Sequence, residues 1–190
     1  PDVSAFVLDA PTIGAYAYAL INPLQVDKAA WADLPTTAVV PHAYREQPHL
    51  FPRLVELKKI DAAQHSNLIE RNQQWIETHG TAYFCALLKT ELSTDGLRAY
   101  LARQMYQYHH ARREYDVIRL HDPRVFRHFR WLLSNQQWDA LLGPINSWAW
   151  PEPNGSWMVR DHLASGSYHA GRPWLAEQQW QSLLRLDEIN

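Results

Sequence analysis

The chain has 190 residues, among which are only one cysteine and seven glycines. The single thiol, Cys85, excludes an internal disulfide framework and any zinc or iron–sulfur site built from several thiolates, and it fits a reducing compartment. The scarcity of glycine argues against a loop that cradles phosphate. Neither the Gly-x-x-x-x-Gly-Lys-Ser/Thr pattern nor the Gly-x-Gly-x-x-Gly pattern occurs.

Long apolar runs and an excess of charge are also missing. No stretch approaches the ~18–20 apolar residues of a membrane span, and the N-terminal sequence has neither the basic nor the apolar region of a signal peptide. The 18 Lys and Arg face 20 Asp and Glu, so the net charge of −2 gives no general reason to expect nucleic acid. We therefore expect a cytoplasmic protein without a membrane partner.

Aromatic residues, in contrast, are abundant. Nine Trp, nine Tyr and five Phe occur in a chain whose 46% hydrophobic and 20% charged residues are otherwise ordinary for a globular protein. Such a surplus of Trp fits either a large core or a surface that contacts another protein.

Strand and helix signals alternate along the chain, which predicts a layered α/β fold, with α+β as the alternative. We expect a mixed central sheet of about five strands, flanked by helices and followed by an appended C-terminal helix. The strands are expected at 15–21, 36–40, 81–90, 114–120 and 145–159. Residues 1–150 would form the α/β domain, and residues 151–190 the end of a hairpin, a loop and the last helix, packed on the same domain.

The helix boundaries have specific capping signals. Asp61 and Gln64 form a capping box, which predicts a helix over 61–79 that stops at Gly80. Asp122 before Pro123 is the arrangement of an N-cap followed by the first helical residue. A second capping box, Ser134 with Gln137, opens a short helix that ends at Gly143 and Pro144. These segments are the clearest local signals in the chain.

No pattern of catalytic or metal-binding residues is present. The chain has ten His, and the closest pairs are His109 with His110 and His121 with His128. Adjacent helical residues point about 100° apart, so His109 and His110 cannot both face one ion, and His121 and His128 have no carboxylate or thiol at ligand spacing beside them. Cys85 lies in an apolar strand, which indicates a buried structural thiol. We therefore predict no catalytic residue, no metal and no cofactor, and a protein that is not an enzyme.

Charge is distributed unevenly along the chain. Between Arg103 and Arg130, seven Arg face three acidic residues, so this stretch carries +4 and the rest of the chain −6. It is either a basic face for an acidic partner or a nucleic-acid backbone, or a set of solvated arginines paired with nearby carboxylates. Arg124, Arg127 and Arg130 follow one another at intervals of three on a predicted helix, which favours exposed contact.

The stretch around residue 122 resembles a known bacterial family. The resemblance rests on Arg119, Asp122-Pro123-Arg124, Leu132-Leu133, Gln136, Trp138, Gly143-Pro144-Ile145 and Trp148, with weaker matches at 18–23 and 51–57. This pattern is similar to that of the "domain of unknown function 4123" family, adaptor chaperones that load toxic effectors onto the type VI secretion spike. The resemblance covers roughly residues 15–150, and it departs from the family at Ile21-Asn22, where an acidic residue is more usual.

The resemblance implies a non-enzymatic adaptor in the bacterial cytoplasm. Its partner would be a secreted effector, with the spike-tip protein as a further candidate. A groove rich in Trp and Tyr would cover apolar surface of the effector, and arginines would orient it. A nucleic-acid-binding module that uses the Arg103–Arg130 stretch is the alternative function, and a metal enzyme or hydrolase that uses clustered His is the least favoured.

Two structural roles follow from the residues themselves. Asp122 caps a helix, and Arg119 is close enough in sequence to pair with it and fix the corner between strand and helix. Trp148, Trp150 and Trp157 gather on the predicted hairpin, where core packing competes with a role as surplus aromatic surface for a partner. Together with the three helix arginines, these tryptophans are the predicted partner-binding residues.

Overall fold

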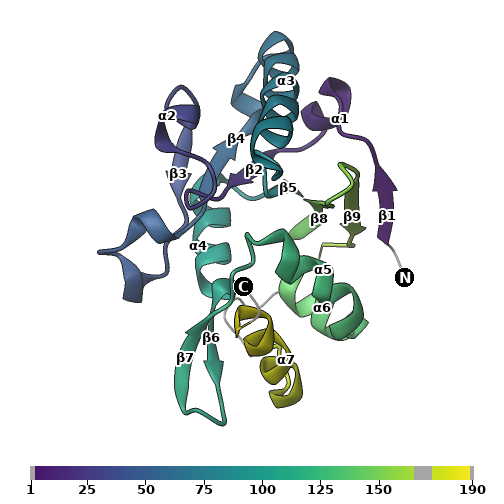
Figure 1. Cartoon of the computed structure of the whole chain (residues 1–190). Coiled ribbons are helices and arrows are strands. Elements are labelled where there is room, and N and C mark those ends of the chain that lie inside the picture. The colour runs from purple at the N-terminus through teal and green to yellow at the C-terminus, as the bar shows by residue number, and fades with distance from the viewer. Residues whose placement is uncertain (1–2, 165–172, 189–190) are drawn as a thin grey trace.

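A seven-stranded antiparallel sheet forms the centre of the molecule (Figure 1). The structure, a computed structural model, describes residues 3–164 and 173–188. In spatial order the strands are β1 (Val3–Phe6), β9 (Trp157–Asp161), β8 (Ile145–Pro151), β5 (Ala86–Thr90), β2 (Tyr18–Ile21), β4 (Arg53–Glu56) and β3 (Thr36–Ala38). Every neighbouring pair in this order is antiparallel, so the expected mixed sheet of about five strands is wrong in strand direction and number.

The central strands are buried on both faces. In β2, Tyr18 and Leu20 belong to one apolar cluster, while Ala19 and Ile21 belong to another. Because successive side chains of a strand point to opposite faces, these two clusters are the two faces of the sheet. The apolar run of β2 therefore matches a strand with helices on both sides.

Different helices cover the two faces of the sheet. Residues of α1 (Ala10–Gly14), α2 (Lys28–Trp31) and α3 (Ala62–His79) pack in the cluster of Ile21. The cluster of Leu20 is covered by α4 (Thr94–Met105), α5 (Pro123–Leu132), α6 (Asn135–Leu142) and α7 (Glu177–Glu188). Figure 1 shows α5, α6 and α7 grouped at one end of the molecule, away from α1 and α3. The predicted α/β layering is confirmed, with the C-terminal helix on the same core.

Local capping chemistry places the helix ends as predicted. Asp61 and Gln64 form the capping box of α3, and Gly80 ends that helix with a φ of 70°. Ser134 and Gln137 form the box of α6, and Gly143 ends it with a φ of 48°. Such positive φ angles favour glycine because it has no Cβ. The carbonyl of Pro144 then accepts a hydrogen bond from Thr90 Oγ1 at 2.8 Å, which joins the α6–β8 turn to β5.

The strands differ from the prediction in two respects. The strand expected at 114–120 forms only as β7 (Glu114–Val117), and it pairs with β6 (Tyr106–His109) in a separate hairpin outside the main sheet. Its β-branched residues signal a strand but not its partner. In addition, β1 and β4 were not predicted from the sequence. Residues 42–52 are irregular as expected, with short 3-10 turns at η1 (His42–Tyr44) and η2 (Pro48–Leu50), and a third, η3 (Leu57–Lys59), follows β4.

The hairpin tryptophans belong to the core. Trp148, Trp150 and Trp157 are at most 1% exposed, so the proposed role as surplus surface for a partner is wrong for the folded chain. The physical reason is that β8 and β9 are interior strands of the sheet, with helices over both faces. Trp148 stacks on Phe126 of α5 with ring centroids 4.3 Å apart. Trp148 and Phe126 therefore fix α5 against one face of the sheet, while Trp157 packs on the opposite face.

Candidate functional site

The corner that leads into α5 is held by Asp122. Its carboxylate accepts the backbone N–H of Arg124 at 2.9 Å, and Pro123 occupies the first turn of the helix. The same carboxylate binds the Arg124 guanidinium, with Nε to Oδ1 at 3.0 Å and Nη2 to Oδ2 at 2.8 Å. Asp122 also donates its backbone N–H to the carbonyl of Arg119 at 2.9 Å. One side chain thus both caps the helix and orients Arg124.

The electrostatics of this corner favour an ionised Asp122. Burial alone would raise the pKa of Asp122, but hydrogen bonds from Arg124 and the positive charges of Arg124 and Arg119 outweigh it, so the pKa is lowered. Arg119 contributes its backbone carbonyl and its positive charge to this corner, and the Asp122 carboxylate forms an ion pair with Arg124.

A cavity of about 230 Å³ lies beside this corner, between the end of α3, the start of α5 and the β8–β9 turn. Two ion pairs line it, that of Asp122 with Arg124 and that of Arg127 Nε with Glu152 Oε2 at 2.9 Å. Glu152 also accepts a hydrogen bond from Trp150 Nε1 at 3.0 Å. Because each arginine faces a carboxylate, the lining carries mutually compensated charges rather than a free cationic site.

The outer face of α5 is where exposed groups gather. Arg130 and Trp131 both lie on it, and Trp131 is 80% exposed. The guanidinium of Arg130 sits 5.2 Å from the Trp131 ring centroid, within the range of a cation–π contact. Within the described residues, Arg130 has no carboxylate within 4.0 Å, unlike Arg124 and Arg127. Of the three predicted contact arginines, the structure therefore leaves Arg130 as the one with its charge uncompensated in the described part of the chain.

Trp131 was missed by the sequence analysis, although a signal was present. The predicted buried stripe of α5 runs through Phe126, Phe129 and Leu133, and position 131 falls outside it. An aromatic residue off the apolar stripe of an amphipathic helix points to solvent. That spacing along the chain is enough to mark Trp131 as an exposed aromatic side chain.

Comparisons with known proteins leave the family open. Searches against protein-family models, curated proteins and solved structures find no match. The resemblance to the adaptor-chaperone family thus stays a prediction carried by the residues from Arg119 to Trp148. Among the residues that the structure describes, no helix is long and apolar enough to cross a membrane.

In the part of the chain that the structure describes, the histidines and the thiol do not gather into a reactive cluster. Across 3–164 and 173–188, no group of three His, Cys, Asp or Glu side chains is placed to hold a metal ion. His109 is buried whereas its neighbour His110 is exposed, so the pair faces in different directions. Burial raises the pKa of the Cys85 thiol, which hydrogen-bonds the Leu20 carbonyl at 3.2 Å, so this thiol is held in its neutral form.

His121 should make the fold sensitive to acid. It is 2% exposed, and burial lowers its pKa from 6.5 to about 4, with Arg119 lowering it further and Asp122 opposing. Between these two pH values the unfolded chain binds a proton that the folded chain does not, so stability falls as the pH drops through this window. That separation corresponds to at most ~3 kcal/mol.

Urea unfolding of the wild-type chain and of His121→Gln, at several pH values from 7 to 4, checks this expectation. We expect the variant to lose less free energy of unfolding over that range than the wild type. Equal slopes for both chains would show that His121 titrates alike in the folded and unfolded states, contrary to its burial.

Proposed function

We propose that this chain is a non-enzymatic adaptor that binds a type VI secretion effector in the bacterial cytoplasm and assists its loading onto the secretion spike. The single observation that carries the proposal beyond the sequence resemblance is the Arg130–Trp131 pair on the outer face of α5. Trp and Arg are the residue types most enriched among interface residues that dominate binding energy.

The arrangement around α5 supports this proposal. The motif residues that carry the resemblance surround the helix: Asp122 caps it, and Trp138 and Trp148 contact Phe126 on its buried side. These contacts hold the helix in place, so Trp131 is presented on a rigid element. A rigid exposed aromatic loses little conformational entropy on binding, which favours its use as an anchor.

The charge pattern favours a protein partner over nucleic acid. In the basic stretch, Arg112 pairs with Glu114 at 2.7 Å, Arg124 with Asp122 at 2.8 Å, and Arg127 with Glu152 at 2.9 Å. A phosphate backbone would have to displace these carboxylates to gain the counterion release that drives such binding. An apolar and acidic protein surface can instead use Trp131 with Arg130 and leave the three ion pairs intact.

Binding of a candidate effector, chosen from the genes that neighbour this one, tests the proposal. We expect the purified chain to form a complex with it in isothermal titration calorimetry, and Trp131→Ala to weaken the affinity at least tenfold, as for a residue that anchors an interface. Val7→Ala is the matched control, because Val7 is 76% exposed but directly follows β1 rather than lying on α5. The absence of a complex, or equal affinities for the wild type and Trp131→Ala, would contradict the proposal.

A further inference from the structure

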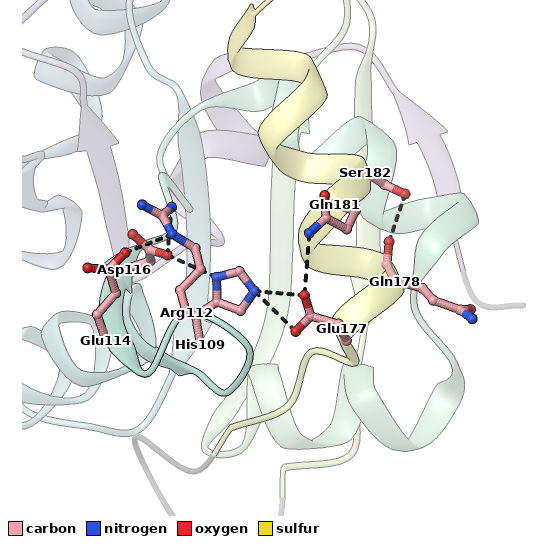
Figure 2. Close-up of polar contacts among 8 residues, drawn as sticks. All are labelled: His109, Arg112, Glu114, Asp116, Glu177, Gln178, Gln181 and Ser182. Carbon is pink, nitrogen blue, oxygen red and sulfur yellow. Dashed lines mark hydrogen bonds and ion pairs between the residues drawn. The ribbon is translucent and has the colours of Figure 1, made fainter.

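The last helix, α7, contacts the rest of the protein through the buried imidazole of His109 (Figure 2). His109 of the β6–β7 hairpin has no exposed surface, and its Nε2 lies 3.1 Å from both carboxylate oxygens of Glu177. On its other side, Nδ1 lies 3.2 Å from Asp116 Oδ2. The His109 ring also stacks on Trp180, with centroids 4.8 Å apart. A single side chain of the hairpin thus contacts two residues of α7.

The two α7 residues occupy one helix face. Glu177 and Trp180 are three positions apart, which places them as neighbours on the same side of a helix. The hydrogen bond from His109 is the main reason why the pKa of Glu177 is lowered, and it outweighs the opposing effect of burial. An ionised carboxylate only accepts hydrogen bonds, so His109 donates to Glu177. The site around His109 therefore recognises an acidic residue that is followed three positions later by Trp.

Charged groups of the hairpin hold His109 in place. Asp116, which faces Nδ1, is 3.4 Å from Arg112 Nη1, and Arg112 Nε is 2.7 Å from Glu114 Oε1 (Figure 2). These residues all belong to the hairpin rather than to α7. The β6–β7 hairpin itself therefore orients the His109 imidazole, and we expect this orientation to persist without α7.

Further contacts join α7 to α5 and α6. Together with the β6–β7 hairpin, these helices form the surface under α7, here called its seat. The Trp174 ring, just before the helix, meets Phe129 edge-on with centroids 5.4 Å apart. Gln179 Nε2 donates to the carbonyl of Leu132 at 2.6 Å, and Gln137 Nε2 donates to the carbonyl of Trp174 at 2.8 Å. Both Trp174 and Trp180 are only 5% exposed. The seat is therefore an apolar surface with a few specific polar groups, as in grooves that bind amphipathic helices.

The helix α7 is short and packs on this surface through one face. Its 12 residues are at the lower limit of the ~12–15 residues below which an isolated helix is marginal in water. Its outward face is polar, with exposed Gln178, Gln181, Ser182 and Arg185. The helical state of α7 thus depends on the contacts around His109 and Phe129. A helix held in this way can be replaced by another with the same contact residues.

We propose that the surface under α7 is a helix-binding groove, and that an amphipathic partner helix with an acidic residue three positions before a Trp takes the place of α7. That this partner helix belongs to the effector rests on the proposed function, whereas the groove does not. Because α7 is tethered, it competes at a high effective concentration, so only a partner that binds more tightly displaces it. Phe129 of α5 lines the groove, and Trp131 lies on the outer face of the same helix. One partner can therefore contact both the groove and the outer face of α5.

A fluorescent peptide of residues 173–190 tests the groove without any effector. Its affinity is measured by anisotropy for the full-length wild-type chain and for full-length Trp180→Ala, in which the resident helix is weakened but the groove is unchanged. We expect the peptide to bind Trp180→Ala at least tenfold more tightly than the wild type, and Glu177→Gln to give a smaller gain. Gln178→Ala, on the outward face, is the matched control and should equal the wild type.

A second peptide, in which the residue corresponding to Trp180 is replaced by Ala, tests whether the same contacts are used. We expect it to bind at least tenfold more weakly to the Trp180→Ala chain. Equal affinity of the first peptide for the wild-type and Trp180→Ala chains, no binding to either, or equal binding of the two peptides would overturn the proposal. None of these results depends on effector binding, so a failed groove and a failed adaptor function are told apart.

Discussion

Replacement of Trp148 by Ala should lower the free energy of unfolding by about 3–5 kcal/mol, as for other large aromatic residues removed from a core. Its side chain is 1% exposed and stacks on Phe126, and no neighbour can fill the space without moving α5 or the sheet. Such a loss is a large part of the ~5–15 kcal/mol that stabilises a typical domain. Urea denaturation followed by far-UV circular dichroism measures it.

Trp131→Ala provides the contrasting control. The same chemical change at an 80% exposed position should alter the free energy of unfolding by no more than about 0.5 kcal/mol. If both substitutions destabilised the fold to a similar degree, the division between core and surface tryptophans would be wrong. If both were neutral, the packing of α5 on the sheet would be wrong.

Asp122→Ala should cost about 2 kcal/mol. Loss of an N-cap side chain typically costs ~1 kcal/mol, and the rest comes from the ion pair with Arg124, which is modest because that guanidinium is partly exposed. Thermal and urea unfolding of the purified variant measure the loss.

Asp122→Asn separates the two contributions. The amide oxygen still caps α5, but the charge that pairs with Arg124 is gone, so we expect about half the loss of Asp122→Ala. An Asn variant as unstable as the Ala variant would mean that the charge, rather than the cap, holds this corner.

Helix ends in this protein could be predicted because their chemistry is local. The capping boxes at Asp61 and Ser134 each involve residues three positions apart, and both formed as expected. Strand partners depend on distant residues. The β-branched residues near β7 predict a strand as well as those of the main sheet do. Yet β7 pairs with β6, the strand that directly follows α4. The alternation of apolar residues predicts a strand but not its neighbour.

The candidate sites could likewise be predicted only where the residues that form them are close in sequence. The cap at Asp122 was predicted because Asp122 and the helix that it begins are neighbours in sequence, whereas the ion pair of Asp122 with Arg124 was not predicted. Trp131 could have been found from its place off the apolar stripe. The contact of His109 with Glu177 joins residues 68 positions apart in sequence, and no local pattern links them. The hairpin tryptophans were ambiguous because an aromatic residue in a strand suits both a core and an interface.

Secretion of a candidate effector, chosen from the genes that neighbour this one, tests the central claim, that the chain is an adaptor, most directly. Strains with the gene intact, deleted, and restored as the wild type or as Trp131→Ala are compared for soluble effector in the cell and for effector in the medium. The account predicts that deletion leaves the effector insoluble or retained, that the wild type restores secretion, and that Trp131→Ala restores it poorly. An effector that stays soluble and is secreted in the deletion strain would contradict the adaptor function.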